Sequence, residues 1–405
     1  MRVAYYSPMP PCRSGVADYS ALLLPELEQR IDVVVARPGR FRRAPQADVA
    51  LYHIGNDPDA HGWIAGALAA RPGVVVLHEF VLHHLVAGLT LARGDARGYL
   101  DAMERGHGLA GRLLAYGVID NRVPPLWETR AEAFPLAGDV LAAATGLVVH
   151  SAFVEERARA AGFAGPVWPI PHPAWPLPSI LAEPVEGRPL IGCFGHLNES
   201  KRIPQLLAAF ARVRAARPDA RLLLVGALAD RLTGLAIPEG VIRDDYVSEE
   251  RLWSLMAACD VIVSLRAPTM GETSGSAMRA LSLGKPLVVS DVGWFAELPD
   301  DIAIRVPVDE HEVDALVAAL DRLAGDPEAR KAMGVAAREL AERDHALPHV
   351  ADLYASALEQ AAGGEAVWDA TLREVAEAAA EVGIGADDVA ASELAVRLDE
   401  VELGG

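Results

Sequence analysis

The segment spanning residues 267–276 combines residue types that suit the binding of a sugar phosphate. It follows an apolar run at 261–265 and precedes an amphipathic run at 277–283, so we expect it to join a buried strand to a helix. Three small residues would begin that helix: Ser274, Gly275 and Ser276. Free backbone N–H groups and hydroxyls at a helix N-terminus bind phosphate, whereas a plain serine N-cap would leave the nearby glycines unexplained. Glu272 would repel phosphate and is better suited to accept hydrogen bonds from sugar hydroxyls.

A lysine follows a second apolar run and suits the same ligand. Residues 190–194 are mostly apolar, and the loop behind them contains Gly195 and His196 before Lys201 at an expected helix start. A cation next to helix N-terminal amides forms a site for a diphosphate. The alternative is a solvated lysine at a helix end, but the glycines around the strand end favour binding.

Polar side chains also follow the strands expected in the first half of the chain. The first loop, residues 7–19, carries Gly15 and Asp18, and it could hold an anion, approach a sugar closely, or be an ordinary turn. Two later loops each begin with a histidine that ends a strand, and each adds a second polar residue: His53 with Asn56, and His78 with Glu79. These side chains could hydrogen-bond substrate hydroxyls, although backbone partners satisfy most lone histidines. We group Asp18, His53, Asn56 and Glu79 as candidate ligands for the acceptor or the sugar.

Strands and helices alternate along the chain and would carry these loops. Apolar runs predict buried strands at 2–6, 31–36, 49–53, 74–78 and 146–150, and then at 190–194, 221–225, 261–265 and 287–290. Helical patterns lie between most of them. The alternation predicts an α/β protein of two Rossmann-like, doubly wound halves, with a ligand cleft between the carboxyl ends of both sheets.

A proline-dense stretch divides the chain into two expected domains, since 405 residues exceed one hydrophobic core and proline interrupts regular elements. The predicted order is a first domain at 1–165 with a helical insertion at 85–141, a linker at 166–189, a second domain at 190–345, a helix at 346–362 that returns toward the first domain, and an acidic helical tail at 363–405.

Composition argues against several functions. The net charge of −19 disfavours nucleic-acid binding, which needs a basic face, and gives little support to binding of an anionic membrane. Three scattered cysteines form no C-x-x-C pair, so we expect no zinc site, no disulfide framework and a reducing, cytoplasmic location. Met1 leads directly into a strand, so no signal peptide is expected. No apolar run reaches the about 18 residues that a transmembrane helix needs.

Several short motifs follow one another in an informative order: Ser-Gly-Val-Ala-Asp-Tyr at 14–19, Val-Val-His-Ser at 148–151, Pro-His-Pro at 171–173, Phe-Gly at 194–195 with Lys201, Tyr-Val-Ser at 246–248, Gly-Glu at 271–272 and Gly-Lys-Pro at 284–286. In this order and spacing, residues 1–362 resemble the retaining glycosyltransferases of the GT-B fold, in particular glycosyltransferase family four. The resemblance implies that the second domain binds a nucleotide-sugar donor and the first domain an acceptor.

The resemblance also implies roles for single residues. Three side chains would act near the reaction centre: Lys201 on the donor diphosphate, Glu272 on the donor sugar, and His78 beside both. Other residues would bind the donor: Gly15, Gly195, Ser274, Gly275 and Ser276 around the phosphates, and the backbone of Tyr246 and Val247 at the base.

Two positions depart from the family pattern. His196 stands where the family usually has an arginine, and Arg279 stands where a second glutamate normally binds the ribose, counting back from Gly284. Arg279 lies about one helical turn beyond Ser276, so it could supply the missing cation of the phosphate site. The nucleotide preference of the family therefore does not transfer directly.

The implied reaction moves a sugar from a nucleotide-diphosphate sugar, such as a UDP- or GDP-sugar, to an acceptor with retention of anomeric configuration. It needs neither a metal nor a cofactor, because positive groups stabilise the leaving diphosphate and a departing phosphate oxygen can take the acceptor's proton. Alternatives on the same scaffold are a non-catalytic nucleotide-sugar-binding relative, an epimerase and a phosphorylase. The sequence does not distinguish a glycan acceptor from a lipid-linked or a small-molecule acceptor. It also leaves open peripheral membrane contact and homo-oligomerisation through the tail.

Overall fold

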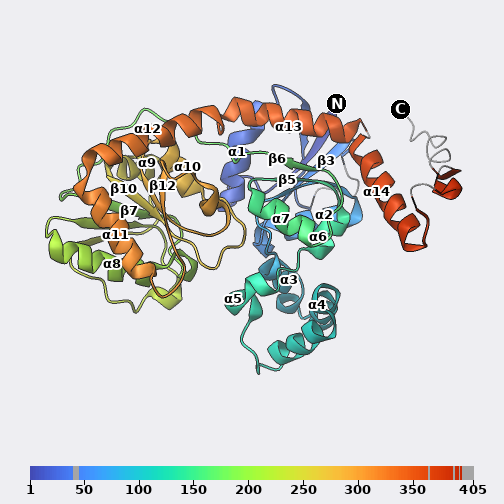
Figure 1. The fold of residues 1–405 in the computed structure, drawn as a ribbon, viewed down its shortest axis with the longest axis horizontal. Helices are drawn as coiled ribbons and strands as arrows, with labels where there is room; N and C mark the ends of the chain where they lie inside the picture. The colour runs from blue at the N-terminus through green and yellow to red at the C-terminus, as the bar shows by residue number, and fades with distance from the viewer. Residues whose placement is uncertain (40–44, 364, 386–387, 392, 395–405) are drawn as a thin grey trace.

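The computed structural model describes residues 1–39, 45–363, 365–385, 388–391 and 393–394, and it contains two six-stranded parallel sheets wrapped by helices (Figure 1). The first sheet has the order β2-β1-β3-β4-β5-β6, and the second has the order β12-β11-β10-β7-β8-β9. The prediction of an α/β protein with two Rossmann-like domains is confirmed.

The first domain is built on strands that are apolar on both faces. They are β1 (Arg2–Tyr6), β2 (Asp32–Val35), β3 (Val49–Ile54), β4 (Gly73–Leu77), β5 (Ala144–Val149) and β6 (Val167–Pro169). Every residue of β3 and β4 is buried, because helices cover both faces of the sheet. These helices include α1 (Gly15–Leu27), α2 (Pro58–Ala70) and α7 (Ala152–Ala160), whose N-caps are Ser14, Asp57 and Ser151.

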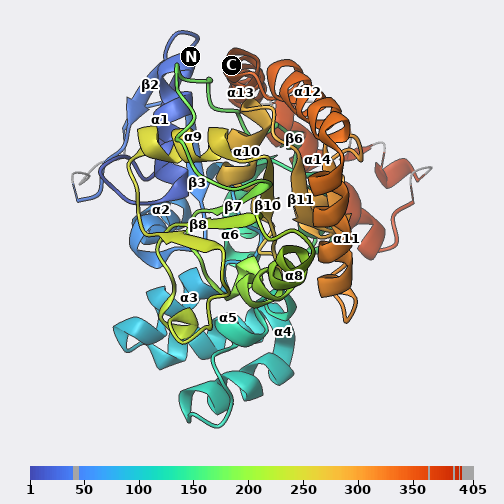
Figure 2. The ribbon, with the colours of Figure 1, turned by 90° about the vertical axis from the view of Figure 1, so that its left-hand side faces the viewer.

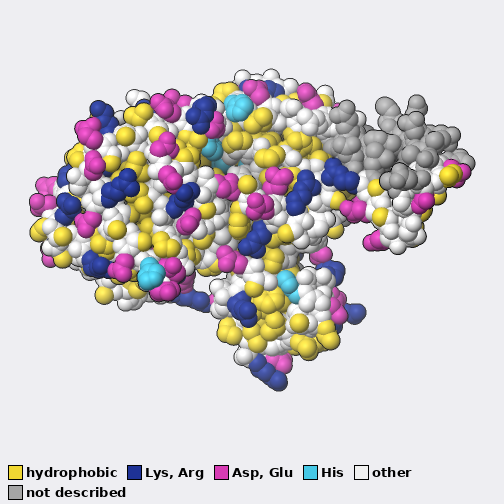
Figure 3. Space-filling view, in the orientation of Figure 1, with side chains coloured by type: hydrophobic (Ala, Val, Ile, Leu, Met, Phe, Trp, Pro, Cys, Tyr) yellow, Lys and Arg dark blue, Asp and Glu magenta, His cyan; other side chains and the backbone are white. Residues whose placement is uncertain are grey.

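A helical lobe follows β4 and projects below the first sheet (Figures 1 and 2). It consists of α3 (His83–Leu89), α4 (Ala96–Ile119) and α5 (Leu126–Thr129), with 3-10 turns at Leu91–Arg93 and Ala131–Ala133, and α6 (Gly138–Ala143) leads back to pack against α2. The lobe has its own small core around Tyr99 and Met103. Its outer surface carries hydrophobic side chains (Figure 3), and three large ones on α4 are exposed: Leu109, Leu113 and Tyr116.

The second domain repeats the plan. Its strands are β7 (Leu190–Phe194), β8 (Arg221–Val225), β9 (Val241–Asp244), β10 (Val261–Ser264), β11 (Leu287–Ser290) and β12 (Ala303–Val306). Its helices are α8 (Ile203–Ala216), α9 (Glu249–Ala258), α10 (Gly275–Ser282), α11 (Glu312–Gly325) and α12 (Pro327–Arg343), with 3-10 turns at Glu199–Lys201, Asp230–Leu232 and Gly293–Glu297. Two buried clusters of side chains, one on each face of the sheet, form its core.

The sequence did not predict the short strands β6, β9 and β12. All three lie at the edge of a sheet, where one side of the strand has no neighbour, so they need no long apolar run. β6 pairs with β5, so the first sheet continues past residue 165 into the segment predicted as a linker. The connection between the sheets is the irregular chain at 170–189.

The C-terminal helices join the two domains. Helix α12 packs against α10 in the second domain, and α13 (Leu347–Ala362) continues along the top of the molecule to pack against α1 in the first (Figure 1). The hydroxyls of Tyr354 and Tyr19 are 2.7 Å apart in this interface. Helix α14 (Glu365–Glu381) follows α13, and residues 395–405 of the predicted tail lie outside the described part.

Candidate functional site

A pocket of about 300 Å³ lies where the carboxyl ends of both sheets face each other. This is the position where open α/β sheets bind ligands. Eight residues singled out from the sequence line it: Gly15, Asp18, Asn56, His78, Glu79, Glu272, Gly275 and Arg279. Loops from both domains thus contribute to one site.

The loop before α10 is held tightly around Glu272. Arg266 Nε lies 2.8 Å from Glu272 Oε1 as an ion pair, although this N–H is not aligned for a hydrogen bond. Glu272 Oε2 accepts hydrogen bonds from Met270 N at 2.7 Å and from Thr269 Oγ1 at 3.2 Å. Protein groups therefore already contact both oxygens of the carboxylate that was expected to face the sugar.

The same loop contacts the first domain directly. Met270 O accepts hydrogen bonds from Phe80 N at 2.8 Å and Val81 N at 3.0 Å, and Thr269 N donates to Glu132 Oε1 at 2.9 Å. Gly271 between them has a φ of +90°, and an added Cβ would lie 3.2 Å from Phe80 N. Only glycine fits this close approach without strain.

These contacts place Glu79, which precedes Phe80, in the pocket with Glu272. Asn56 N donates to Glu79 Oε2 at 2.6 Å, while Asn56 Oδ1 accepts from Leu85 N at the start of α3. Burial raises the pKa of Glu79 to about 7, and the charge of Glu272 adds to the effect. This carboxyl group therefore changes its charge near neutral pH.

Four histidines that lie at or after strands of the first sheet surround the ring of Tyr19: His53, His78, His150 and His172. His150 Nδ1 donates to Ile170 O at 2.8 Å, and His172 Nδ1 lies 2.9 Å from Pro173 O. Burial lowers the pKa of all four imidazoles, that of His150 to about 4, and neighbouring imidazoles lower it further for His53, His78 and His172. The pocket wall is therefore lined by neutral imidazoles at neutral pH.

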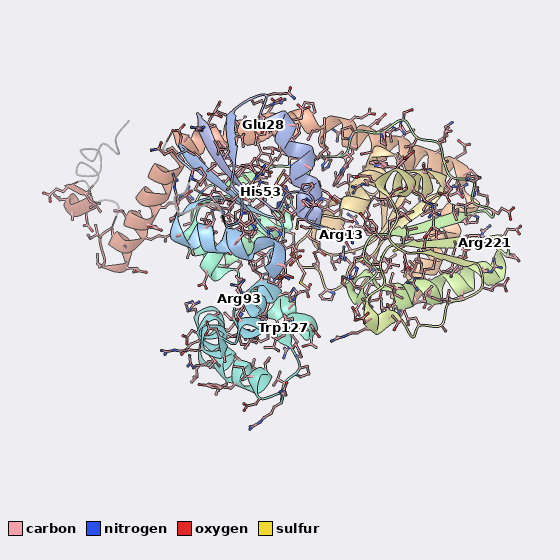
Figure 4. All side chains as sticks on the ribbon, turned by 180° about the vertical axis from the view of Figure 1, so that it is seen from behind. Arg13, Glu28, His53, Arg93, Trp127 and Arg221 are labelled. Carbon is pink, nitrogen blue, oxygen red and sulfur yellow. The ribbon has the colours of Figure 1, made fainter. Side chains whose placement is uncertain are left out.

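His53 does not line the pocket, contrary to the expectation that it contacts the acceptor. Its side chain is fully buried inside the first domain (Figure 4), and its Nδ1 lies 3.0 Å from His78 Nε2. His53 is thus in a position to orient His78 and not to touch a ligand. The ends of β3 and β4 pair side by side in the sheet, which brings the two rings together.

Arg279 occupies the wall formed by α10. Its guanidinium lies 3.9 Å from the ring centre of Trp175, and its Nη2 donates to Glu249 Oε1 at 2.9 Å. The side chain is only 8% exposed, so stacking on the indole holds it in place. Asp18 faces it from α1: burial raises the pKa of Asp18, and the charge of Arg279 opposes that shift.

Lys201, Gly195 and Ser276 form a second group at the end of β7, beside the pocket lining. Lys201 Nζ donates to Phe194 O at 2.6 Å, and Ser276 Oγ donates to the same oxygen at 3.3 Å. A Cβ on Gly195 would lie 3.2 Å from Ser276 Oγ and 3.3 Å from Lys201 Nζ, so a side chain here would crowd both groups. Burial lowers the pKa of Lys201 to about 8, and Arg266 lowers it further.

The remaining predicted residues lie away from the pocket lining. Ser274 is buried and caps α10, since Ala277 N donates to its Oγ. His196 is exposed. Tyr246 is 77% exposed and lies with Val247 in the β9–α9 loop, where Arg13 from the first loop stands 5.6 Å from the tyrosine ring centre. Figure 4 shows Arg13 where the first domain meets the second.

Sequence reasoning did not single out the pocket residues His150, His172 and Trp175. The two histidines stand in the Val-Val-His-Ser and Pro-His-Pro motifs, and their position at or after strand ends was the available signal. Trp175 lies in the proline-dense connection, where no pattern indicated its stacking on Arg279.

The described residues contain neither a cluster suited to a metal ion nor a helix suited to cross a membrane. Among residues 1–39, 45–363 and the described parts of the tail, no cluster of three or more His, Cys, Asp or Glu side chains has a geometry that would hold a metal ion. Within the same part of the chain, no helix has the length and apolar character required to cross a membrane.

The second domain is similar in sequence to known proteins. Residues 182–340 match the family model described as "Glycosyl transferases group 1". A GDP-mannose-dependent α-(1-6)-phosphatidylinositol monomannoside mannosyltransferase from Mycolicibacterium smegmatis is 29% identical over 166 residues. That match covers 38% of this chain and 43% of the relative, so it spans less than half of either protein.

Solved structures match over most of the chain. Sucrose-phosphate synthase from Thermosynechococcus elongatus has a TM-score of 0.61 and 16% identity, with 89% of this chain and 98% of that chain covered. Anabaena HepE in complex with UDP and glucose has a TM-score of 0.56 and 16% identity, with 89% and 100% covered. Residues 182–340 are therefore similar to the group 1 glycosyltransferases, and the chain has the GT-B fold, as its resemblance to glycosyltransferase family four implied.

Proposed function

We propose that this protein transfers a sugar from a nucleotide-diphosphate sugar to an acceptor hydroxyl with retention of anomeric configuration. The observation that carries the proposal is the pocket between the two sheets, which combines the N-terminal end of α10, the guanidinium of Arg279 and the carboxylates of Glu79 and Glu272. Cationic and amide groups suit a diphosphate, and carboxylates suit sugar hydroxyls.

The diphosphate is the leaving group, so stabilisation of its negative charge lowers the barrier. In the proposal, the backbone of Gly275 and Ser276 and the side chain of Arg279 bind the phosphates from the second domain, and Gly15 approaches them from the first. Lys201 Nζ lies beside Ser276 and exchanges its bond to Phe194 O for a phosphate oxygen when the donor binds. His196 is exposed and is expected to contribute less.

The sugar would lie between Glu272 and His78, and the acceptor hydroxyl would approach from the side of Asp18, Asn56 and Glu79. The nucleotide base would reach the backbone of Tyr246 and Val247. We propose a UDP- or GDP-sugar as donor, because HepE was crystallised with UDP and the mycobacterial relative is named as GDP-mannose-dependent. A metal-independent reaction in the cytoplasm is part of the same proposal.

The first experiment is a thermal-shift screen of UDP-, GDP- and ADP-sugars, because a bound ligand raises the melting temperature. It is followed by an assay of nucleotide release, with and without EDTA, and by NMR of the product anomer. Donor binding without release of nucleotide on any acceptor would refute the transferase and favour a non-catalytic binding protein. Conversion of the donor sugar without release of nucleotide would favour an epimerase.

A further inference from the structure

The first turn of α9 brings a carboxylate to the edge of the pocket. Glu249 Oε1 accepts a hydrogen bond from Arg279 Nη2 at 2.9 Å, and Arg279 lines the pocket. Within the described residues, the other oxygen of Glu249 accepts no hydrogen bond, and the side chain is 59% exposed. The next residue, Glu250, is an exposed acid in the same turn, and only its backbone oxygen accepts a hydrogen bond from the described side chains. The contact with Arg279 therefore separates Glu249 from an ordinary solvated acid at a helix start.

Arg279 fixes the position of this carboxylate. Its guanidinium stacks on Trp175 and lies 5.8 Å from the ring centre of Trp253, so the cation cannot follow a mobile side chain into solvent. Its Nη1 makes only a long bond of 3.4 Å to Gly275 O, at the start of α10 where the phosphates are proposed to bind. One guanidinium thus holds Glu249 with one nitrogen and faces the phosphate site with the other. Its positive charge also offsets the repulsion between Glu249 and a diphosphate.

The chain order places Glu249 between the proposed sites for the base and the phosphates. Tyr246 and Val247, whose backbone is proposed to contact the base, come shortly before it in the sequence. Arg13 of the first domain stands 5.6 Å from the ring centre of Tyr246 and is followed by Ser14 of the pocket lining. In a nucleoside diphosphate, the ribose joins the base to the phosphates. A side chain between these two sites is therefore in a position to contact the ribose.

A second carboxylate faces Glu249 from the first domain. Burial raises the pKa of Asp18, the charge of Arg279 opposes this shift, and the charge of Glu249 adds to it, so the three groups lie near one another. Asp18 lines the pocket and accepts no hydrogen bond from a described side chain. It is therefore the competing ligand for the ribose. Glu249 is favoured because Arg279 orients it and because it shares a domain with the proposed base and phosphate sites.

We propose that Glu249 recognises the ribose of the donor by accepting hydrogen bonds from its 2′- and 3′-hydroxyl groups, an inference that rests on the proposed function. In dinucleotide-binding α/β folds, an acidic residue likewise binds the ribose 2′-hydroxyl. Arg279 stands where the family usually has a ribose-binding glutamate, and here this arginine holds a glutamate from α9 instead. Oε1 of Glu249 keeps its bond to Arg279, and the other oxygen takes the hydroxyls.

The test compares each nucleotide with its counterpart that lacks both ribose hydroxyls. Calorimetry with the full-length protein measures the dissociation constants of UDP and 2′,3′-dideoxy-UDP, and of GDP and 2′,3′-dideoxy-GDP. Because hydrogen bonds to charged groups are the strong ones, the wild type should bind the dideoxy forms about 10- to 150-fold more weakly. Glu249→Ala should bind both forms equally well. Glu249→Gln keeps a neutral acceptor and should discriminate less than the wild type but more than Glu249→Ala.

Glu250→Ala is the matched control, since it removes an exposed acid from the same helical turn. It should keep the discrimination of the wild type. The ratio of the two dissociation constants is the readout, because a general weakening of the site or a loss of stability affects both nucleotides alike and leaves the ratio unchanged.

Three results would overturn the inference. They are equal binding of both forms by the wild type, full discrimination in Glu249→Ala, and a loss of discrimination in Asp18→Asn alone, which would assign the ribose to the first domain. Failure of the wild type to bind any nucleotide or nucleotide sugar would instead refute the proposed function, and the inference with it.

Discussion

Replacing Lys201 with methionine should stabilise the ligand-free protein and weaken its binding of nucleotide diphosphate. Burial lowers the pKa of Lys201 from 10.5 to about 8. This difference corresponds to a penalty of about 3 kcal/mol on the charged form at neutral pH. Methionine keeps an apolar stem of similar length but loses the hydrogen bond to Phe194 O, which contributes about 1 kcal/mol. We therefore expect Lys201→Met to raise the free energy of unfolding by about 2 kcal/mol at pH 7.

The pH dependence checks the cause. Because the folded protein releases the proton of Lys201 at a lower pH than the unfolded chain, the penalty is complete below pH 8 and disappears between pH 8 and 10.5. Wild-type stability should gain this contribution as pH rises through that window, and Lys201→Met should not. Urea unfolding followed by tryptophan fluorescence measures both curves.

Binding gives the second readout. A hydrogen bond to a charged group contributes about 1.5–3 kcal/mol, so the variant should bind UDP or GDP about 10- to 150-fold more weakly in calorimetry. Lys285→Met is the matched control, since Lys285 is a second lysine whose pKa burial lowers, and its Nζ donates to Ala257 O and Cys259 O away from the pocket. A Lys201→Met protein that is less stable than wild type, or that binds the nucleotide equally well, would refute the reasoning.

Three further predictions concern the contacts of the first domain with α13 and with the second domain, and the buried His150. Tyr19→Phe and Tyr354→Phe should each lower the free energy of unfolding by about 1 kcal/mol. The double variant should lose no more than the larger single loss, because both substitutions remove the same hydrogen bond, and additive losses in urea unfolding would contradict this. Glu297→Gln weakens the acceptor for Ala152 N and Phe153 N at the start of α7, so the free energy of unfolding should fall by about 0.5–1 kcal/mol. An unchanged free energy of unfolding would contradict a stabilising role of this contact between the domains. Burial lowers the pKa of His150 to about 4, so the unfolded chain takes up this proton first and wild-type stability should fall as pH drops from 6.5 toward 4, by up to about 1.4 kcal/mol per pH unit. His150→Gln should show a shallower fall in urea unfolding, and parallel curves would refute this prediction.

The central strands of both sheets could be predicted because burial on two faces requires continuous apolar residues. The runs at β3, β4 and β10 are of this kind, and each contains only buried residues. The edge strands β9 and β12 are short and contain an arginine, so a search for continuous apolar runs does not predict them. Strand β6 was not predicted because its three residues end in proline within a proline-dense stretch.

The location of the site could also be predicted, because parallel strands place their following loops at one edge of each sheet. That rule brought Gly15, Asn56, Glu79 and Gly275 to one pocket. It could not predict which way each side chain turns. Lys201 bonds to the carbonyl of Phe194, and Ser274 uses its hydroxyl on its own helix, since local hydrogen bonds fix both before any ligand is present.

The chemistry of Glu79 depends on a contact that no stretch of sequence contains. Its carboxyl group lies in the first domain, and the charge that adds to its pKa shift belongs to Glu272 in the second. The hydrogen bonds from Phe80 N and Val81 N to Met270 O hold these two loops together. If the domains separated, Glu79 would lose both the nearby negative charge and part of its burial, and its pKa would fall toward its ordinary value. A carboxyl group that changes its charge near pH 7 therefore exists only where the two loops meet, which makes this titration a property of the closed pocket and not of either domain alone.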